Sequence, residues 1–136
     1  MQTITVESTI NAPVAQVWTL WTSPEHIKNW NTASEDWHTT HAENDLRAGG
    51  SFSSRMEAKD GSFGFDFNGS YDAVNLHEHI AYTIADGRKV TITFSGSGNT
   101  TKITETFEAE NTNPLDMQRG GWQAILDNFK KYAESN

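Results

Sequence analysis

The sequence predicts an α+β fold in which a curved antiparallel sheet of about six or seven strands wraps around one long C-terminal helix. Three observations support this prediction. A first strand is followed by two short helices, the middle of the chain alternates in polarity between short turns, and one apolar stripe at helical spacing lies near the end. The 136 residues suit a single domain spanning 1–136.

The N-terminal part predicts one strand and two helices. Residues 3–10 alternate between polar and apolar side chains, which is typical of a half-buried strand. Asn11-Ala12-Pro13 ends this strand and begins an amphipathic helix, because proline suits the first helical turn. Ser23-Pro24-Glu25 repeats that start with a hydroxyl cap, so a second short helix is expected after a tight corner.

Residues 37–110 are predicted to be strands throughout. The pairs Asp60-Gly61 and Asp86-Gly87 are typical of hairpin turns, and such short connections imply antiparallel pairing. The segment 95–98, Ser-Gly-Ser-Gly, is also expected to be a hairpin, because it lacks the lysine of a phosphate-binding loop. A long strand is expected to place these residues on one face: Phe63, Phe65, Phe67, Gly69, Tyr71 and Ala73.

Asn113-Pro114 predicts the start of the last helix, with asparagine as the cap and proline as the first helical residue. The helix is expected to run for about twenty residues, or ~30 Å, which is long enough to cross a sheet. Its apolar stripe consists of Trp122, Ile125, Leu126, Phe129 and Tyr132.

Composition restricts the classes of partner. Eighteen acidic residues against ten basic ones give a net charge of −8, which argues against nucleic acid and anionic membrane surfaces. There are no cysteines and no apolar run long enough to span a bilayer. The N-terminal residues lack the pattern of a signal peptide, so a soluble cytoplasmic domain is expected. Aromatic residues reach 11% of a chain that is 35% hydrophobic, and such large flat side chains favour an internal cavity.

Glu105 is the most informative polar residue, because alternation places it with Ile103 and Phe107 on the face expected to be buried. Burying a carboxylate is unfavourable unless it is paired or protonated. Two interpretations stay open. Glu105 is either a polar anchor or general acid/base in a ligand cavity, or a structural residue that pairs with a cation or turns outward at a strand irregularity.

The histidines do not predict a metal site. His77 and His79 lie two residues apart after a turn, but no third ligand follows at a recognisable spacing, so surface exposure is expected. His38 and His41 are expected to face opposite ways on their strand. No nucleophile motif is present, and neither catalytic residues, metal nor cofactor is predicted.

Trp30 and Trp37 flank the polar segment 31–36. This segment is either a lid over a ligand or a loop anchored by two indoles, and anchoring is favoured.

The order of these elements resembles the START-like (Bet v 1-like) superfamily, and more closely its branch related to the activator of Hsp90 ATPase. The resemblance extends over nearly the whole chain and is carried by Ile10-Asn11-Ala12-Pro13, Val17-Trp18, Trp21-Thr22-Ser23-Pro24-Glu25, Trp30, Asp45-Leu46-Arg47-Ala48-Gly49-Gly50-Ser51-Phe52, Gly69-Ser70-Tyr71, the hairpin from Tyr82 to Asp86-Gly87, and Gly121-Trp122. It implies a helix-grip fold with a cavity for apolar ligands between the concave face of the sheet and the long helix.

The candidate positions in that cavity are the inward-facing side chains Phe52, Met56, Phe65, Phe67, Tyr71, Tyr82, Phe94, Glu105, Phe107, Trp122 and Phe129. The competing interpretation is that the rings simply fill the core.

Three functions follow as hypotheses. The first is a non-catalytic carrier or sensor that binds a small apolar molecule. The second is an enzyme of the cyclase or hydrolase type, with Glu105 and His38 as an acid/base pair. The third is a co-chaperone-like module with a protein partner of the chaperone type. A monomer or weak dimer is expected.

Overall fold

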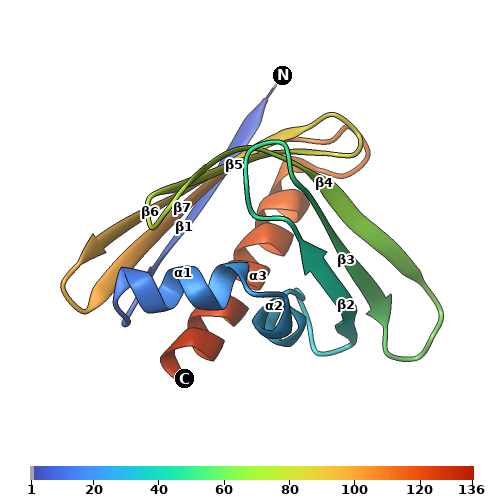
Figure 1. The fold of residues 1–136 in the computed structure, drawn as a ribbon. Helices are drawn as coiled ribbons and strands as arrows, with labels where there is room; N and C mark the ends of the chain where they lie inside the picture. Colours follow the sequence, from blue (N-terminus) through green and yellow to red (C-terminus); the bar gives the residue numbers. More distant parts are fainter. Residues whose placement is uncertain (1) are drawn as a thin grey trace.

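A computed structural model describes residues 2–136 and shows a seven-stranded antiparallel sheet curled into a half-barrel, with helices filling its open side (Figure 1). The strands are β1 (Thr3–Ile10), β2 (Trp37–Asn44), β3 (Ser51–Ala58), β4 (Gly64–Asn75), β5 (His79–Ile84), β6 (Lys89–Ser97) and β7 (Thr100–Glu108). The helices are α1 (Val14–Thr22), α2 (Pro24–Trp30) and α3 (Leu115–Glu134). The predicted α+β class, the two short helices and the twenty-residue C-terminal helix are confirmed.

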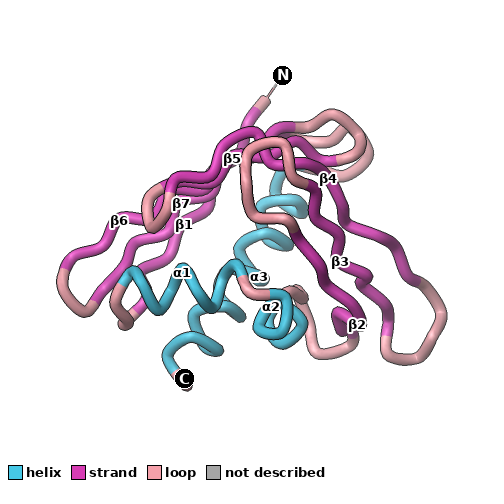
Figure 2. Tube along the Cα trace, viewed as in Figure 1, coloured by secondary structure: helices cyan, strands magenta, loops and turns pink. Residues whose placement is uncertain are grey.

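The strand order is β1-β7-β6-β5-β4-β3-β2, so the chain forms a meander from β2 to β7 and then closes against β1. The pair α1–α2 carries the chain from β1 at one edge to β2 at the opposite edge, across the open side of the curl (Figure 2). Helix α3 packs against β1, α1 and α2. No helix in residues 2–136 is both long enough and apolar enough to cross a membrane.

The core lies on the concave face of the sheet, where alternation directs every second side chain inward. In β7, for example, Ile103 and Phe107 are fully buried. Three rings then join the helices to one another: Phe129 of α3 lies edge-on to Trp21 and to Trp30, with ring centroids 4.8 and 4.9 Å apart. Such edge-to-face pairs stabilise beyond the area that they bury.

The helix starts differ in detail from the prediction. Pro24 is the first residue of α2, as expected, but the Ser23 side chain makes no capping hydrogen bond. Pro114 precedes α3 instead of being its first residue, and the Asn113 side chain donates to Glu110 rather than to the helix. Gln118, buried in the first turn, hydrogen-bonds to this connection instead, accepting from the Glu110 amide and donating to the Asn113 carbonyl.

A register shift in β4 and the later start of that strand change which of the predicted residues face inward. In β4 the pairing with β5 shifts between Tyr71 and Ala73, so Val74, and not the predicted Ala73, packs against the core. Phe63 lies before the first residue of β4 and is 62% exposed, so it does not share the inner face as predicted. A bulge adds one residue and thereby reverses the alternation that follows it.

Candidate functional site

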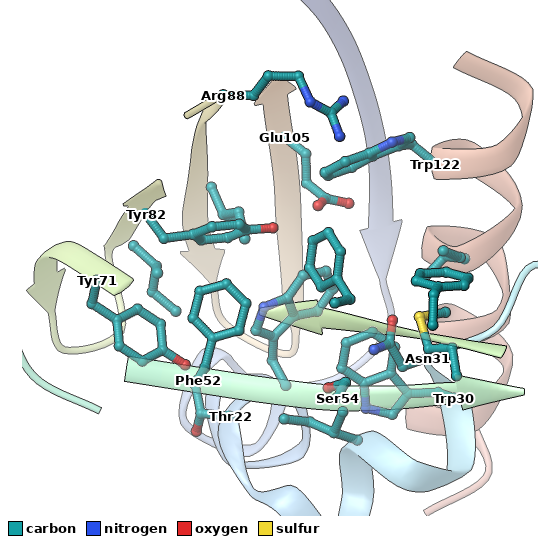
Figure 3. A pocket seen from close by; sticks show the side chains of 18 of the residues that line it. Thr22, Trp30, Asn31, Phe52, Ser54, Tyr71, Tyr82, Arg88, Glu105 and Trp122 are labelled. Carbon is teal, nitrogen blue, oxygen red and sulfur yellow. The ribbon is translucent and has the colours of Figure 1, made fainter. Parts of the chain in front are cut away.

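A cavity of about 290 Å³ lies between the concave face of the sheet and the helices (Figure 3). Its wall is formed by Trp21, Thr22, Ile27, Trp30 and Asn31 of α1, α2 and the following loop; by Phe52, Ser54, Met56, Phe65, Phe67, Tyr71, Ile80, Tyr82, Ile92 and Glu105 of β3 to β7; and by Arg88, Glu110, Gln118, Trp122 and Ile125. The wall is therefore mainly aromatic and aliphatic, with a few polar groups.

A small residue opposes a large one where β3 and β4 border the space. Ser54 pairs with Phe67, and both residues line the cavity. Gly69, the partner of Phe52, is not part of the wall; a Cβ there would lie only 2.2 Å from the carbonyl oxygen of Thr83, so the close approach of β5 requires glycine. Protein interiors are normally packed without voids of this size, so the cavity distinguishes this part of the protein from an ordinary core.

Most of the residues proposed from the sequence lie in this wall, namely Phe52, Met56, Phe65, Phe67, Tyr71, Tyr82, Glu105 and Trp122. Three proposed positions do not. Phe94 packs between Trp18 and Trp21, Phe107 lies beneath the indole of Trp122, and Phe129 fills the junction of the helices. These three rings face inward as predicted, but neighbouring rings separate them from the cavity.

Several wall residues were absent from the sequence-based set. Ile80 shares the alternation of Tyr82 in β5, and Ile92 shares that of Phe94 in β6, so the pattern contained the signal for both. Trp21, Trp30 and Arg88 come from the helices and a hairpin turn, and no spacing within the sequence relates them to the sheet.

Glu105 is 4% exposed and sits in β7, with Val6 and Ile92 as its partners on the flanking strands. Within residues 2–136 its carboxyl group has neither an ion-pair partner nor a hydrogen-bond partner. Burial raises the pKa of Glu105 to about 8, because charging a group away from water is unfavourable. At neutral pH the side chain is therefore mainly a neutral carboxylic acid that faces the cavity.

Tyr82 and Arg88 lie at the same end of the cavity as Glu105 (Figure 3). Burial raises the pKa of the Tyr82 phenol well above its ordinary value, and the Glu105 charge adds to this effect. The Arg88 guanidinium donates through Nε to the Asp86 carboxylate at 2.9 Å and through an Nη to the Glu108 carbonyl at 3.5 Å. Arg88 is thus held by Asp86 of its own hairpin and by the backbone of β7, and not by Glu105.

His38 is exposed and pairs across the strands with Glu57, on the face opposite to Met56 and the cavity. The hypothesised acid/base pair of His38 with Glu105 is therefore not formed. The expectation that His38 and His41 face opposite ways is also wrong, because the register shifts between Thr39 and His41 and leaves both histidines exposed.

His77 and His79 are both half-buried, so the surface exposure expected of them is wrong. His77 is in the turn before β5, and its half-buried ring lies against Trp18, with ring centroids 5.9 Å apart. No group of three or more potential metal ligands occurs in the described part of the chain.

The segment 31–36 is anchored at both ends. The Trp30 indole N–H donates to the Leu20 carbonyl at 2.9 Å, and Trp37 packs against Phe63 and Phe65. Asn128 of α3 donates to the Trp30 carbonyl at 2.9 Å. These contacts agree with the anchored loop favoured from the sequence.

A curled antiparallel sheet that grips a C-terminal helix around an apolar cavity defines a START-like, helix-grip domain. Comparison with protein families then narrows the class. Residues 11–134 match the family described as Activator of Hsp90 ATPase homolog 1-like protein, and the chain belongs to this AHSA1-like family.

Solved structures agree with this assignment. An AHSA1-like protein from Aeromonas hydrophila is 42% identical, with a TM-score of 0.93 over 98% of this chain and 93% of that one. A protein from Cytophaga hutchinsonii is 53% identical, with a TM-score of 0.84 over 98% and 92%. A protein from Chromobacterium violaceum, at 22% identity, shares the fold with a TM-score of 0.89 over the full length of both chains. No curated protein matches the sequence.

Proposed function

We propose that this protein binds a small, largely apolar molecule in the cavity between the sheet and α3, as a carrier or sensor. The observation that supports this most directly is the wall itself. Aromatic rings from β3, β4, β5 and α3 surround an unfilled space, and a few polar groups lie at its margin. Pockets for small organic molecules commonly combine an apolar wall with a few placed polar groups.

The volume indicates the size of the ligand. About 290 Å³ corresponds to roughly ten water molecules at ~30 Å³ each. This is at the lower end of the range of ligand pockets. A compact molecule of one or two rings therefore suits the cavity better than a long-chain lipid.

Titration with a panel of compact aromatic compounds, fatty acids, sterols, flavonoids and an environment-sensitive dye tests the proposal. Because Trp21, Trp30 and Trp122 line the cavity, occupancy is expected to change the intrinsic fluorescence. We expect saturable binding with a Kd below ~100 μM for at least one compact compound. The absence of saturable binding across the panel would contradict the proposal.

A matched pair of variants locates the binding. Ser54→Phe places a ring in the cavity, whereas Ser53→Phe places the same ring on the opposite face of β3. Loss of binding is expected for the first variant and not for the second. Equal affinities for the two variants would mean that the ligand binds elsewhere.

The family assignment supports a second candidate, an interaction with a chaperone-type partner. At the β3–β4 hairpin Phe63 is 62% and Phe65 is 39% exposed, and both rings pack against the half-buried Trp37 of β2. Exposed apolar groups of this kind can contact a protein partner. Stimulation of an Hsp90-type ATPase by the wild-type protein but not by Phe63→Ser would support this function, and no stimulation would contradict it.

A further inference from the structure

Two unpartnered polar side chains lie at one end of the cavity. Glu105 is 4% exposed and Tyr82 is 8% exposed, and neither side chain has a hydrogen-bond partner within residues 2–136. Figure 3 shows the Tyr82 hydroxyl and the Glu105 carboxyl pointing toward one another at the edge of the space. No side-chain nitrogen or oxygen of the described residues is both sealed from solvent and without a partner, so these two groups are open to the cavity and can hydrogen-bond to whatever occupies it.

All three groups at this end can donate a hydrogen bond. A phenol and a neutral carboxylic acid each carry one O–H donor beside their acceptor lone pairs, and the guanidinium of Arg88, which lines the same end, carries donors only. Glu105 is mainly protonated at neutral pH because its pKa is about 8. Two O–H donors that converge beside a cation suit an oxygen acceptor, and they suit a cationic ligand less well.

The aromatic side chains in the rest of the wall favour a ligand in which that oxygen is attached to a planar ring system. Phe52 and Tyr82 lie edge to face with centroids 4.9 Å apart, and Phe67 lies edge to face with Trp122 at 6.3 Å. Rings arranged in this way leave both edges and faces for contact with another aromatic ring.

We propose that Glu105 and Tyr82 together bind the carbonyl oxygen of a compact aromatic ketone or aldehyde by donating two hydrogen bonds to it. This inference rests on the proposed function and names the ligand class for the same cavity. A tyrosine and a neutral carboxylic acid that converge on one ligand oxygen are an established combination in enzymes that stabilise negative charge on that oxygen.

The groups around Glu105 make its titration the one expected to control binding. Arg88, from the β5–β6 turn, is paired with Asp86, and Glu110, after β7, accepts from Asn113. Tyr71 of β4 lies further along the wall, where its hydroxyl accepts from Asn44 at 3.4 Å. In the described chain, α3 contributes Gln118, Trp122 and Ile125 to the wall, β6 contributes Ile92, and β1 places Val6 beside Glu105; none of these is ionisable.

Three probes with one ring system test the inference: 2-acetylnaphthalene, 2-isopropylnaphthalene and 1-(2-naphthyl)ethylamine, each titrated by NMR. The ketone and the hydrocarbon have nearly the same shape, so their affinity ratio measures the contribution of the oxygen. We expect the ketone to bind roughly a hundredfold more tightly than the hydrocarbon, about tenfold for each of the two hydrogen bonds. Its affinity is expected to fall about tenfold from pH 7 to pH 9, while that of the hydrocarbon stays constant.

Variants assign the effect to the two side chains. Tyr82→Phe is expected to lower the preference for the ketone roughly tenfold and leave the hydrocarbon affinity unchanged. Glu105→Gln keeps a donor, so it is expected to keep the preference but lose the decline above pH 8. Tyr132→Phe removes a hydroxyl that contacts His26 outside the cavity wall, and it serves as the control.

Two results would overturn the inference while leaving the proposed function intact. One is equal affinity for the ketone and the hydrocarbon. The other is tightest binding of the amine with affinity rising above pH 8, which would indicate that a Glu105 carboxylate binds a cation. Failure of all three probes to bind would instead contradict both the inference and binding of compact aromatic molecules.

Discussion

The indole of Trp122 stacks on the ring of Phe107, with the ring centroids 4.0 Å apart and the ring planes at 10° to one another. Phe107 is fully buried in β7, whereas Trp122 is half-buried on α3 and also lines the cavity. One face of the indole therefore completes the core, and the side chain also forms part of the wall. Phe107 thus belongs to the filled core, and Trp122 lies between this core and the cavity.

Trp122→Ala is expected to lower the free energy of unfolding by about 2 kcal/mol, less than the 3–5 kcal/mol typical of a tryptophan packed on all sides. The reason is that truncation removes the stacking on Phe107 but only enlarges a space that already exists. Phe129→Ala, at a fully buried ring, is the comparison and is expected to cost about 4 kcal/mol. Urea unfolding measures both, and equal losses would mean that Trp122 is packed as tightly as Phe129.

Glu105→Gln is expected to stabilise the protein at neutral pH. The pKa of Glu105 is about 8 in the folded protein against an ordinary 4.5, so the unfolded chain ionises first as pH rises. The associated stability is fully present below pH 4.5 and is lost as pH rises to about 8. At pH 7 the wild-type protein has lost about 3 kcal/mol of its free energy of unfolding in this way, and the Glu105→Gln variant avoids this loss.

Urea unfolding of both proteins at pH 4, 7 and 8.5 measures this difference. The advantage of the glutamine variant is expected to be near zero at pH 4 and largest at pH 8.5. Glu78→Gln, at an exposed position, is the control and is expected to show no such trend. If Glu105→Gln were less stable than the wild type at pH 7, the carboxylate would be ionised and paired.

Replacing glycine with alanine is expected to raise the stability at one position and to lower it at another. Gly120 is exposed in α3 and an added Cβ meets no atom within 4 Å, so Gly120→Ala should raise stability by about 0.5–1 kcal/mol. Gly69→Ala places a Cβ 2.2 Å from the Thr83 carbonyl oxygen and should lower stability by on the order of 3 kcal/mol. Thermal unfolding distinguishes the two, and a tolerated Gly69→Ala would mean that β4 and β5 can separate easily.

Trp30→Phe tests the anchor of the first loop. The carbonyl of Leu20 would accept from residue 24 in a continuing helix, but Pro24 has no N–H, and the Trp30 indole donates to it instead. Phenylalanine keeps most of the packing and leaves this buried acceptor unpaired, so a loss of about 2 kcal/mol is expected. A loss below about 0.5 kcal/mol in urea unfolding would show that water or another donor replaces the indole.

Much of the fold could be predicted because its signals are local. Alternation identified the inward face of β1, β6 and β7, and it placed Glu105 on the buried side. The turn pairs at Asp60-Gly61 and Asp86-Gly87 located hairpins, and the apolar stripe gave the length of α3. These features depend on the residues within one element, so the order of residues is sufficient to reveal them.

The tertiary structure alone decided two other things. The register shift in β2 leaves both His38 and His41 exposed, and the shift in β4 directs Val74 instead of Ala73 toward the core. Such bulges depend on the pairing between strands, which the order of residues within one strand does not reveal. The division between core and cavity depends on which distant side chains fill the space before each ring. Trp21, Trp30 and Trp122 cover Phe94, Phe129 and Phe107, while the small side chain of Ser54 lines the cavity beside Phe52 and Phe67. Local periodicity predicts that a side chain faces inward. Only the packing between elements determines whether that side chain contacts other core residues or lines the cavity.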